Sequence, residues 1–150
     1  MTTRVLLNAS DRATFVKLLE SYKFPCTVNV VKGKDRTIEQ NRLQRLWHNE
    51  AAEQLGDETA EQKRAYCKLH FGVPILRAES EEFCAAYDKH IRPLSYEAKL
   101  AFMSVPLDFP VTRLMRTKQK HDFLEQMRTH YEALGVRLTI PQSDEQEQAA

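Results

Sequence analysis

The sequence predicts an α+β fold: a predominantly helical single domain with a small N-terminal β-sheet. The chain of 150 residues has 4 glycines and 6 prolines, set in long stretches rich in Glu, Lys, Gln, Leu and Ala, and this composition favours helices. Hydrophobic residues make up 42% of the chain and charged residues 29%, as in one folded domain of this length. Residues with β-branched side chains gather near the N-terminus, which favours short strands there.

The N-terminal part is predicted to run strand, helix, strand. Residues 4–8, RVLLN, have the pattern of a short strand. Apolar residues at spacings of three and four then predict a helix over 11–22, with Ser10 as its N-cap. Residues 26–33, CTVNVVKG, are rich in β-branched side chains and end at a glycine, which predicts a second strand.

Helices are predicted for most of the remaining chain. Capping residues at their starts and Gly or Pro at their ends place them over 37–55, 60–71, 81–91, 96–103 and 117–134. The sequence GVPIL, residues 72–76, is expected to break the second of these helices. Residues 136–141 predict a short closing strand, and residues 142–150 predict a disordered acidic tail.

Positive charge is concentrated in two segments although the formal net charge is only +1. Residues 32–45 hold five basic and two acidic residues, and residues 111–120 hold four basic and none acidic. Each segment leads into a predicted helix, whose first amides favour phosphate, and Lys and Arg release counterions from a polyanion. The predicted nucleic-acid contacts, with Gln and Asn adding hydrogen bonds, are Lys32, Lys34, Arg36, Gln40, Asn41, Arg42, Arg45, Arg113, Arg116, Lys118 and Lys120.

The sequence also leaves open a base-stacking surface and a zinc site. Aromatic side chains suited to base stacking are Trp47, Tyr66 and Phe109. Trp47 also falls in the apolar sector of its helix, where a tryptophan more often belongs to the core. Residue types that bind zinc occur, at irregular spacing, at Cys67, His70, Cys84 and His90. Buried thiols and surface histidines are the alternative explanation of that set.

Catalytic chemistry is not expected. The acidic residues of 50–61 and 81–88 fit solvated helix faces, and the chain has no phosphate-binding P-loop, dinucleotide fingerprint or nucleophile elbow. We therefore expect neither enzymatic activity nor a cofactor. Three cysteines cannot all pair, and no apolar stretch approaches the ~20 residues that span a bilayer, so we expect a cytoplasmic protein with no membrane partner. Two alternatives stay open: a structure-selective DNA nuclease that uses the acidic residues, and a protein-interaction adaptor whose basic faces meet acidic partner tails.

Two stretches resemble the phage NinB/lambda Orf recombination protein family. RTIEQNRLQRLW, residues 36–47, resembles the Arg-Ser/Thr-x-x-Gln-Asn helix entrance of that family, and residues 110–139 resemble its closing segment. The resemblance implies a NinB-like DNA-binding domain over residues 1–141. The positions carried over from the family are Arg36, Gln40, Asn41, Arg42, Arg113, Lys118 and Lys120.

The same resemblance implies what the protein does and with what. It implies a phage or prophage accessory of homologous recombination, a mediator that works in the cytoplasm of a bacterial host cell. Such a protein binds single-stranded DNA without strong sequence preference, and duplex DNA more weakly, as a homodimer. It helps to load a recombinase onto DNA coated by single-strand-binding protein, and no catalytic activity is implied.

Overall fold

The computed structural model describes residues 4–31 and 36–141, and for residues 36–38 the backbone alone. The chain divides into two compact units, Met1–Arg36 and Thr37–Ala150. The predicted acidic tail lies outside the described residues. So do the predicted contacts Lys32 and Lys34, and the side chain of Arg36.

The first unit contains one helix, α1 (Ala9–Glu20). Asn8 caps it, because its side-chain oxygen accepts a hydrogen bond from the backbone N–H of Asp11 at 2.9 Å. The cap therefore lies two residues before the predicted Ser10, which the structure places inside the helix. No residue of α1 is buried, so this helix gains little from packing within its own unit.

The predicted N-terminal β-sheet is wrong. Residues 4–8 and 26–31 form no strand, and the structure has no strand in any part of the chain that it describes. Val30 is 83% and Val31 79% exposed. A β-branched side chain favours a strand only where the backbone pairs and the side chain packs on a half-buried surface, and these segments have neither.

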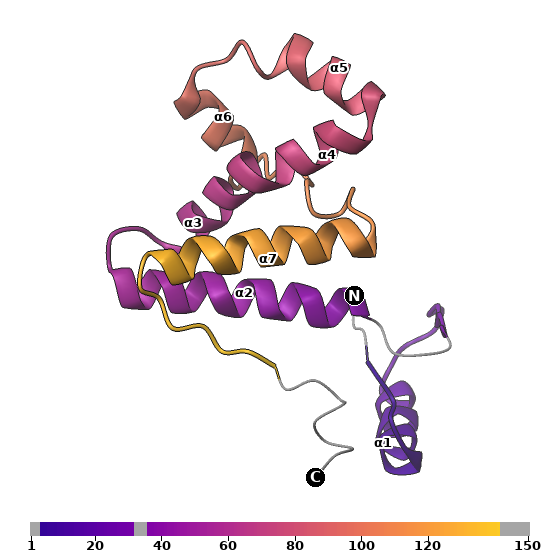
Figure 1. The fold of residues 1–150 in the computed structure, drawn as a ribbon. Coiled ribbons are helices and arrows are strands. Elements are labelled where there is room, and N and C mark those ends of the chain that lie inside the picture. Colours follow the sequence, from indigo (N-terminus) through magenta and orange to yellow (C-terminus); the bar gives the residue numbers. More distant parts are fainter. Residues whose placement is uncertain (1–3, 32–35, 142–150) are drawn as a thin grey trace. The chain divides into compact units, whose positions relative to one another are not determined.

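Two long helices, α2 (Arg36–Leu55) and α7 (Thr117–Ala133), form the base of the second unit. They lie side by side and run in the same direction (Figure 1). Both end as predicted, at glycines in the left-handed region: Gly56 has φ 64° and Gly135 has φ 85°. The core between them contains Trp47, Ala51, Phe123, Leu124, Met127 and Tyr131.

A third long helical stretch lies against α7. It consists of α3 (Ala60–Cys67), a π-helical turn (Lys68–Gly72) and α4 (Val73–Glu79). The predicted break over residues 72–76 is therefore wrong. The N–H of Val73 reaches back to the carbonyl of Lys68, so the wider turn carries the chain past Pro74, which sits in the first turn of α4 where its missing N–H costs little.

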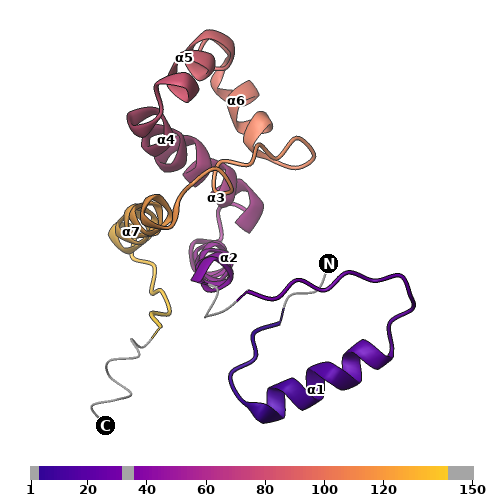
Figure 2. The ribbon, with the colours of Figure 1, turned by 90° about the vertical axis from the view of Figure 1, so that its right-hand side faces the viewer.

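Two shorter helices complete this unit, α5 (Glu81–His90) and α6 (Tyr96–Met103). Their predicted caps are confirmed, because the side chains of Ser80 and Ser95 each accept a backbone N–H at 3.2 Å. Figure 2 shows α4, α5 and α6 on the side of α3 that faces away from α2. Their shared core contains Ala65, Val73, Leu76, Tyr87, Met103 and Val111.

The closing segment 136–141 has no regular secondary structure, so the predicted closing strand is also wrong. Side chains of α2 satisfy its backbone instead. Gln54 bonds both the N–H and the carbonyl of Arg137, at 2.7 and 2.8 Å. The carboxylate of Glu50 accepts the N–H of Thr139 at 2.9 Å, and Trp47 Nε1 donates to the carbonyl of Thr139 at 2.8 Å. None of the helices in the described ranges has the length and apolar character to cross a membrane.

Candidate nucleic-acid interface

A groove of about 930 Å³ is formed by α2, α3 and the segment that leads into α7. Its cationic lining residues are Arg45, Arg64, Arg113, Arg116 and Lys120. Its neutral polar lining residues are Gln40, Asn41, Gln44, His48, Asn49, Thr112 and Thr117. The two basic segments recognised in the sequence therefore contribute to one concave surface, which we call the groove.

The structure separates the predicted contacts into three sets. Six of them line the groove: Gln40, Asn41, Arg45, Arg113, Arg116 and Lys120. Arg42 and Lys118 are exposed on α2 and α7 but are not lining residues. Lys32, Lys34 and the side chain of Arg36 lie outside the described residues.

Several lining residues were not recognised from the sequence. Gln44 and His48 follow Gln40 at intervals of four along α2, so the row was visible in the sequence, but the burial of His48 was not. His48 is only 2% exposed. Arg64 carried no local signal, because only the packing of α3 over α2 brings it to the groove.

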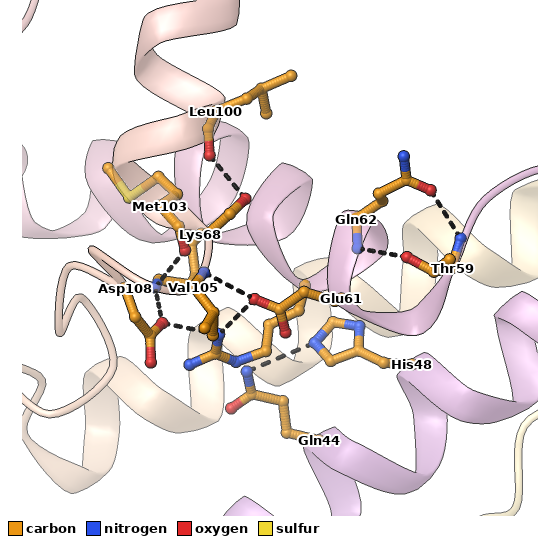
Figure 3. A network of polar contacts seen from close by, with 12 residues as sticks. Gln44, His48, Thr59, Glu61, Gln62, Lys68, Leu100, Met103, Val105 and Asp108 are labelled. Atoms are coloured by element: carbon orange, nitrogen blue, oxygen red, sulfur yellow. Dashed lines mark hydrogen bonds and ion pairs between the residues drawn. The ribbon is translucent and has the colours of Figure 1, made fainter.

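Arg64 is held by carboxylates at the edge of the groove. Its guanidinium lies 2.7 Å from Asp108 Oδ1 and 3.3 Å from Glu61 Oε1. Glu61 also accepts the N–H of Val105 at 3.2 Å, a contact drawn in Figure 3. The positive charge of Arg64 is thus largely offset within the protein.

The buried side chain of Lys68 holds the carboxylate of Asp108 in place. Lys68 is 1% exposed, and its amine donates to Asp108 Oδ1 at 2.8 Å and to the carbonyl of Met103 at 2.7 Å (Figure 3). Hydrogen bonds from Arg64 and Lys68 lower the pKa of Asp108 to about 2, while burial lowers the pKa of Lys68. Asp108 has φ 45°, a conformation that Asp adopts more readily than most residues.

The remaining arginines differ in their pairing. Arg116 is 80% exposed and forms an ion pair with Glu79 at 2.9 Å, and its backbone N–H donates to Gln119 at the start of α7. Arg45 and Arg113 are exposed and form no ion pair with any other residue that the structure describes. These two carry the exposed, unpaired positive charge of the groove.

Lys120 lies at the floor of the groove and begins a chain of hydrogen bonds into the core. Its amine donates to Gln44 Oε1, and Gln44 Nε2 lies 3.4 Å from His48 Nε2. His48 Nδ1 is 2.8 Å from the hydroxyl of Tyr131, which is 3.5 Å from Cys67 Sγ. An ammonium only donates, so Gln44 must turn its NH₂ toward His48, and His48 then carries its proton on Nδ1.

The pKa values of this chain follow from burial. Burial first, then the charges of Arg64, Lys120 and Lys63, lower the pKa of His48 to about 3, so His48 is neutral at pH 7. Burial, then the charge of Arg64, lowers the pKa of Lys120 to about 8. Burial raises the pKa of Cys67 to about 12, which keeps this cysteine a thiol.

No family model, curated protein or solved structure matches this chain. The side chains of the groove themselves indicate what it can bind. Exposed Arg45 and Arg113 attract an anion, and the amides of Gln40, Asn41 and Asn49 offer both donors and acceptors. Together they suit a polymer that has phosphates along its backbone and polar groups on its bases.

The aromatic candidates for base stacking are all occupied by other rings or by the core. Trp47 is 2% exposed, so its predicted core position is confirmed. Tyr66 stacks between His70 and His130, with ring centroids 4.1 and 5.2 Å away. Phe109 stacks on Phe102 at 4.9 Å.

The four residues considered as zinc ligands, Cys67, His70, Cys84 and His90, do not form a metal site among the described residues. Within the described ranges, no three His, Cys, Asp or Glu side chains gather as metal ligands would. Cys67 contacts Tyr131, and His70 bonds the hydroxyl of Tyr96 at 2.9 Å. Cys84 lies 3.6 Å from Asp88, whose carboxylate is held by Arg77.

Proposed function

We propose that this chain binds single-stranded DNA along the groove, without strong sequence preference, and serves as an accessory of phage homologous recombination. The observation that carries the proposal is the convergence of Arg45, on α2, with Arg113, before α7, on one concave surface. The same two stretches of sequence carry the resemblance to the NinB family. Local patterns and spatial arrangement thus support the same site.

The chemistry of the lining supports sequence-tolerant binding. Arginine side chains contact phosphates and release counterions whatever the base. Gln40, Asn41 and Asn49 lie beside Arg45 in the groove, and amides bond phosphate, sugar or base edges with little preference. With Trp47, Tyr66 and Phe109 already packed, affinity would come mainly from charge and hydrogen bonds.

The size of the groove supports a single strand. Its volume of about 930 Å³ is near the upper end of the ~300–1,000 Å³ typical of small-ligand pockets. A few nucleotides of an extended strand fit such a space, and the resemblance of residues 36–47 and 110–139 to the NinB family implies a preference for a single strand over a duplex. We therefore propose weaker binding to duplex DNA.

The protein partners implied by the resemblance belong to the same proposal: a second copy of the chain, single-strand-binding protein and a recombinase. What supports these partners is the resemblance of residues 36–47 and 110–139 to that family. Light scattering at several concentrations would measure whether two copies associate.

A salt titration tests the proposed function. The affinity for a dye-labelled single strand and for the matching duplex is measured by fluorescence anisotropy over a range of salt concentrations. We expect tighter binding to the single strand and a linear loss of affinity with the logarithm of salt. The same strands incubated with Mg²⁺ or Mn²⁺ should remain intact, and cleavage would favour the nuclease alternative. Absence of binding at low salt would favour an adaptor.

A further inference from the structure

Lys120 is an unusual cation for a surface groove. It is 4% exposed although it lines the groove. Buried lysines normally have a carboxylate partner, but the amine of Lys120 bonds the neutral side chain of Gln44 and lies 5.7 Å from the centre of the Phe123 ring. Its charge is therefore weakly compensated by the protein.

The charged groups around Lys120 do not compensate its positive charge. On α2 they are Arg45 and His48, on α3 Glu61 and Arg64, and on the segment before α7 Asp108, Arg113 and Arg116. Both carboxylates in this set are bonded to Arg64, and His48 is neutral at pH 7. The charge of Arg64 repels the ammonium of Lys120 and so lowers its pKa.

Gln44 fixes where the amine points. Its Oε1 accepts from Lys120, and its Nε2 is held by His48, which is held in turn by Tyr131. Because the donors and acceptors of this chain have one consistent direction, turning Gln44 over would set its NH₂ against the ammonium. Gln44 is thus a positioning residue that keeps the amine of Lys120 at the groove floor.

We propose that Lys120 forms a phosphate subsite at the groove floor, and that a phosphate of the bound strand placed there draws a proton from solvent onto its amine. This inference rests on the proposed function, because it assigns one phosphate contact within the same groove. An anion supplies the compensation that the protein lacks, so the amine keeps its proton up to a higher pH when the strand is bound.

The proton uptake makes binding depend on pH. Without a strand, the pKa of Lys120 is about 8, against an ordinary value of 10.5. If the phosphate restores the ordinary value, affinity is greatest below about pH 7. Linkage then lowers it by about tenfold from pH 7 to pH 9.

The test is the affinity for dye-labelled oligodeoxyadenylate, whose bases do not titrate in this range, between pH 7 and pH 9 at constant ionic strength. Wild type should lose about tenfold in affinity. Lys120→Arg should bind with little change over this range, because a guanidinium stays charged. Lys120→Gln should bind more weakly at pH 7 and also show little change. Lys89→Gln, an exposed control on α5, should follow wild type.

The outcomes separate this inference from the function on which it rests. A wild-type affinity that does not change with pH, a Lys120→Arg variant that loses affinity as wild type does, or a Lys120→Gln variant that binds like wild type would each overturn the subsite while leaving the proposed function in place. Failure of wild type to bind any strand would overturn both. Circular dichroism checks the fold of each variant, and Lys120→Arg decides the matter if Lys120→Gln does not fold.

Discussion

The amine of Lys120 donates a hydrogen bond to Oε1 of Gln44, and this contact joins α7 to α2 at the floor of the groove. Gln44 lies in the basic segment 32–45, and Lys120 lies in the basic segment 111–120. Their contact places the start of α7 against the face of α2 that carries Gln40 and Arg45. The apolar core between α2 and α7 holds the two helices together, and this hydrogen bond adds a polar link between them at the groove.

Asp108→Asn should destabilise the second unit. The substitution leaves Lys68, which is 1% exposed, without its anionic partner, while asparagine tolerates the φ of 45° at this position. The loss should be about 1–3 kcal/mol in the free energy of unfolding, measured in urea. The control is Asp122→Asn at an exposed position of α7, and equal unfolding midpoints in the two variants would contradict the role given to Asp108.

Stability should fall as the pH drops below about 6.5 because of His48. Its pKa is about 3 in the folded chain against an ordinary 6.5, so the unfolded state takes up the proton first and stability rises with pH in this window. The slope from one such group is at most about 1.4 kcal/mol per pH unit.

The variant His48→Gln separates this histidine from the others. Urea unfolding at several pH values should give a shallower slope between pH 6 and pH 4 for His48→Gln than for wild type. Asp108, with a pKa of about 2, is a depressed carboxyl that contributes only at lower pH, as stability is lost from about pH 4 downward. Identical slopes for the two proteins would show that His48 is not buried in its neutral form.

Gly72→Ala should be destabilising because of one close approach. A Cβ added at Gly72 would lie 2.5 Å from Val111 Cγ1 and 3.4 Å from Met115 Cε. The segment that carries Arg113 must then shift, at a cost of about 1–3 kcal/mol. Thermal unfolding measures the cost, and a melting temperature equal to that of wild type would contradict this packing.

Local signals were sufficient to predict most helices. Thr59, Ser80 and Ser95 each cap a helix through their own side chain, and Gly56 and Gly135 end the two long helices. These signals act within a few residues of the boundary, so a single sequence contains them.

The errors occurred where distant contacts decide the outcome. β-branched residues near the N-terminus have no partner strand among the described residues, and the closing segment bonds side chains of Gln54 and Glu50 instead. The helix continues past Pro74 because a π-helical turn precedes it, and no local sequence pattern predicts that turn. His48 is buried by Tyr131 of α7, which no local pattern on α2 could indicate.

The candidate site was predicted only in part, because it also depends on contacts between residues that are distant in the sequence. Basic and amide residues are visible in the sequence, and Arg45 and Arg113 proved to share one surface. Which of the basic residues form ion pairs is not visible in the sequence, because it depends on neighbours such as Glu79, which binds Arg116. Nor is the exclusion of Arg42 from the lining visible, since it depends on which face of α2 borders the groove.

The most direct test of the account is the salt dependence of single-strand binding by the double variant Arg45→Ala/Arg113→Ala. These arginines are exposed and without an ion pair to any described residue, so their removal should weaken binding to all single-stranded sequences alike. The control, Lys89→Ala/Arg137→Ala, removes the same charge from exposed positions outside the groove. We predict that the slope of log affinity against log salt becomes shallower by about 1.4 for the groove variant, from two lost phosphate contacts, and stays at the wild-type value for the control. Equal affinities and slopes for both variants and wild type would contradict the assignment of the groove as the DNA-binding surface.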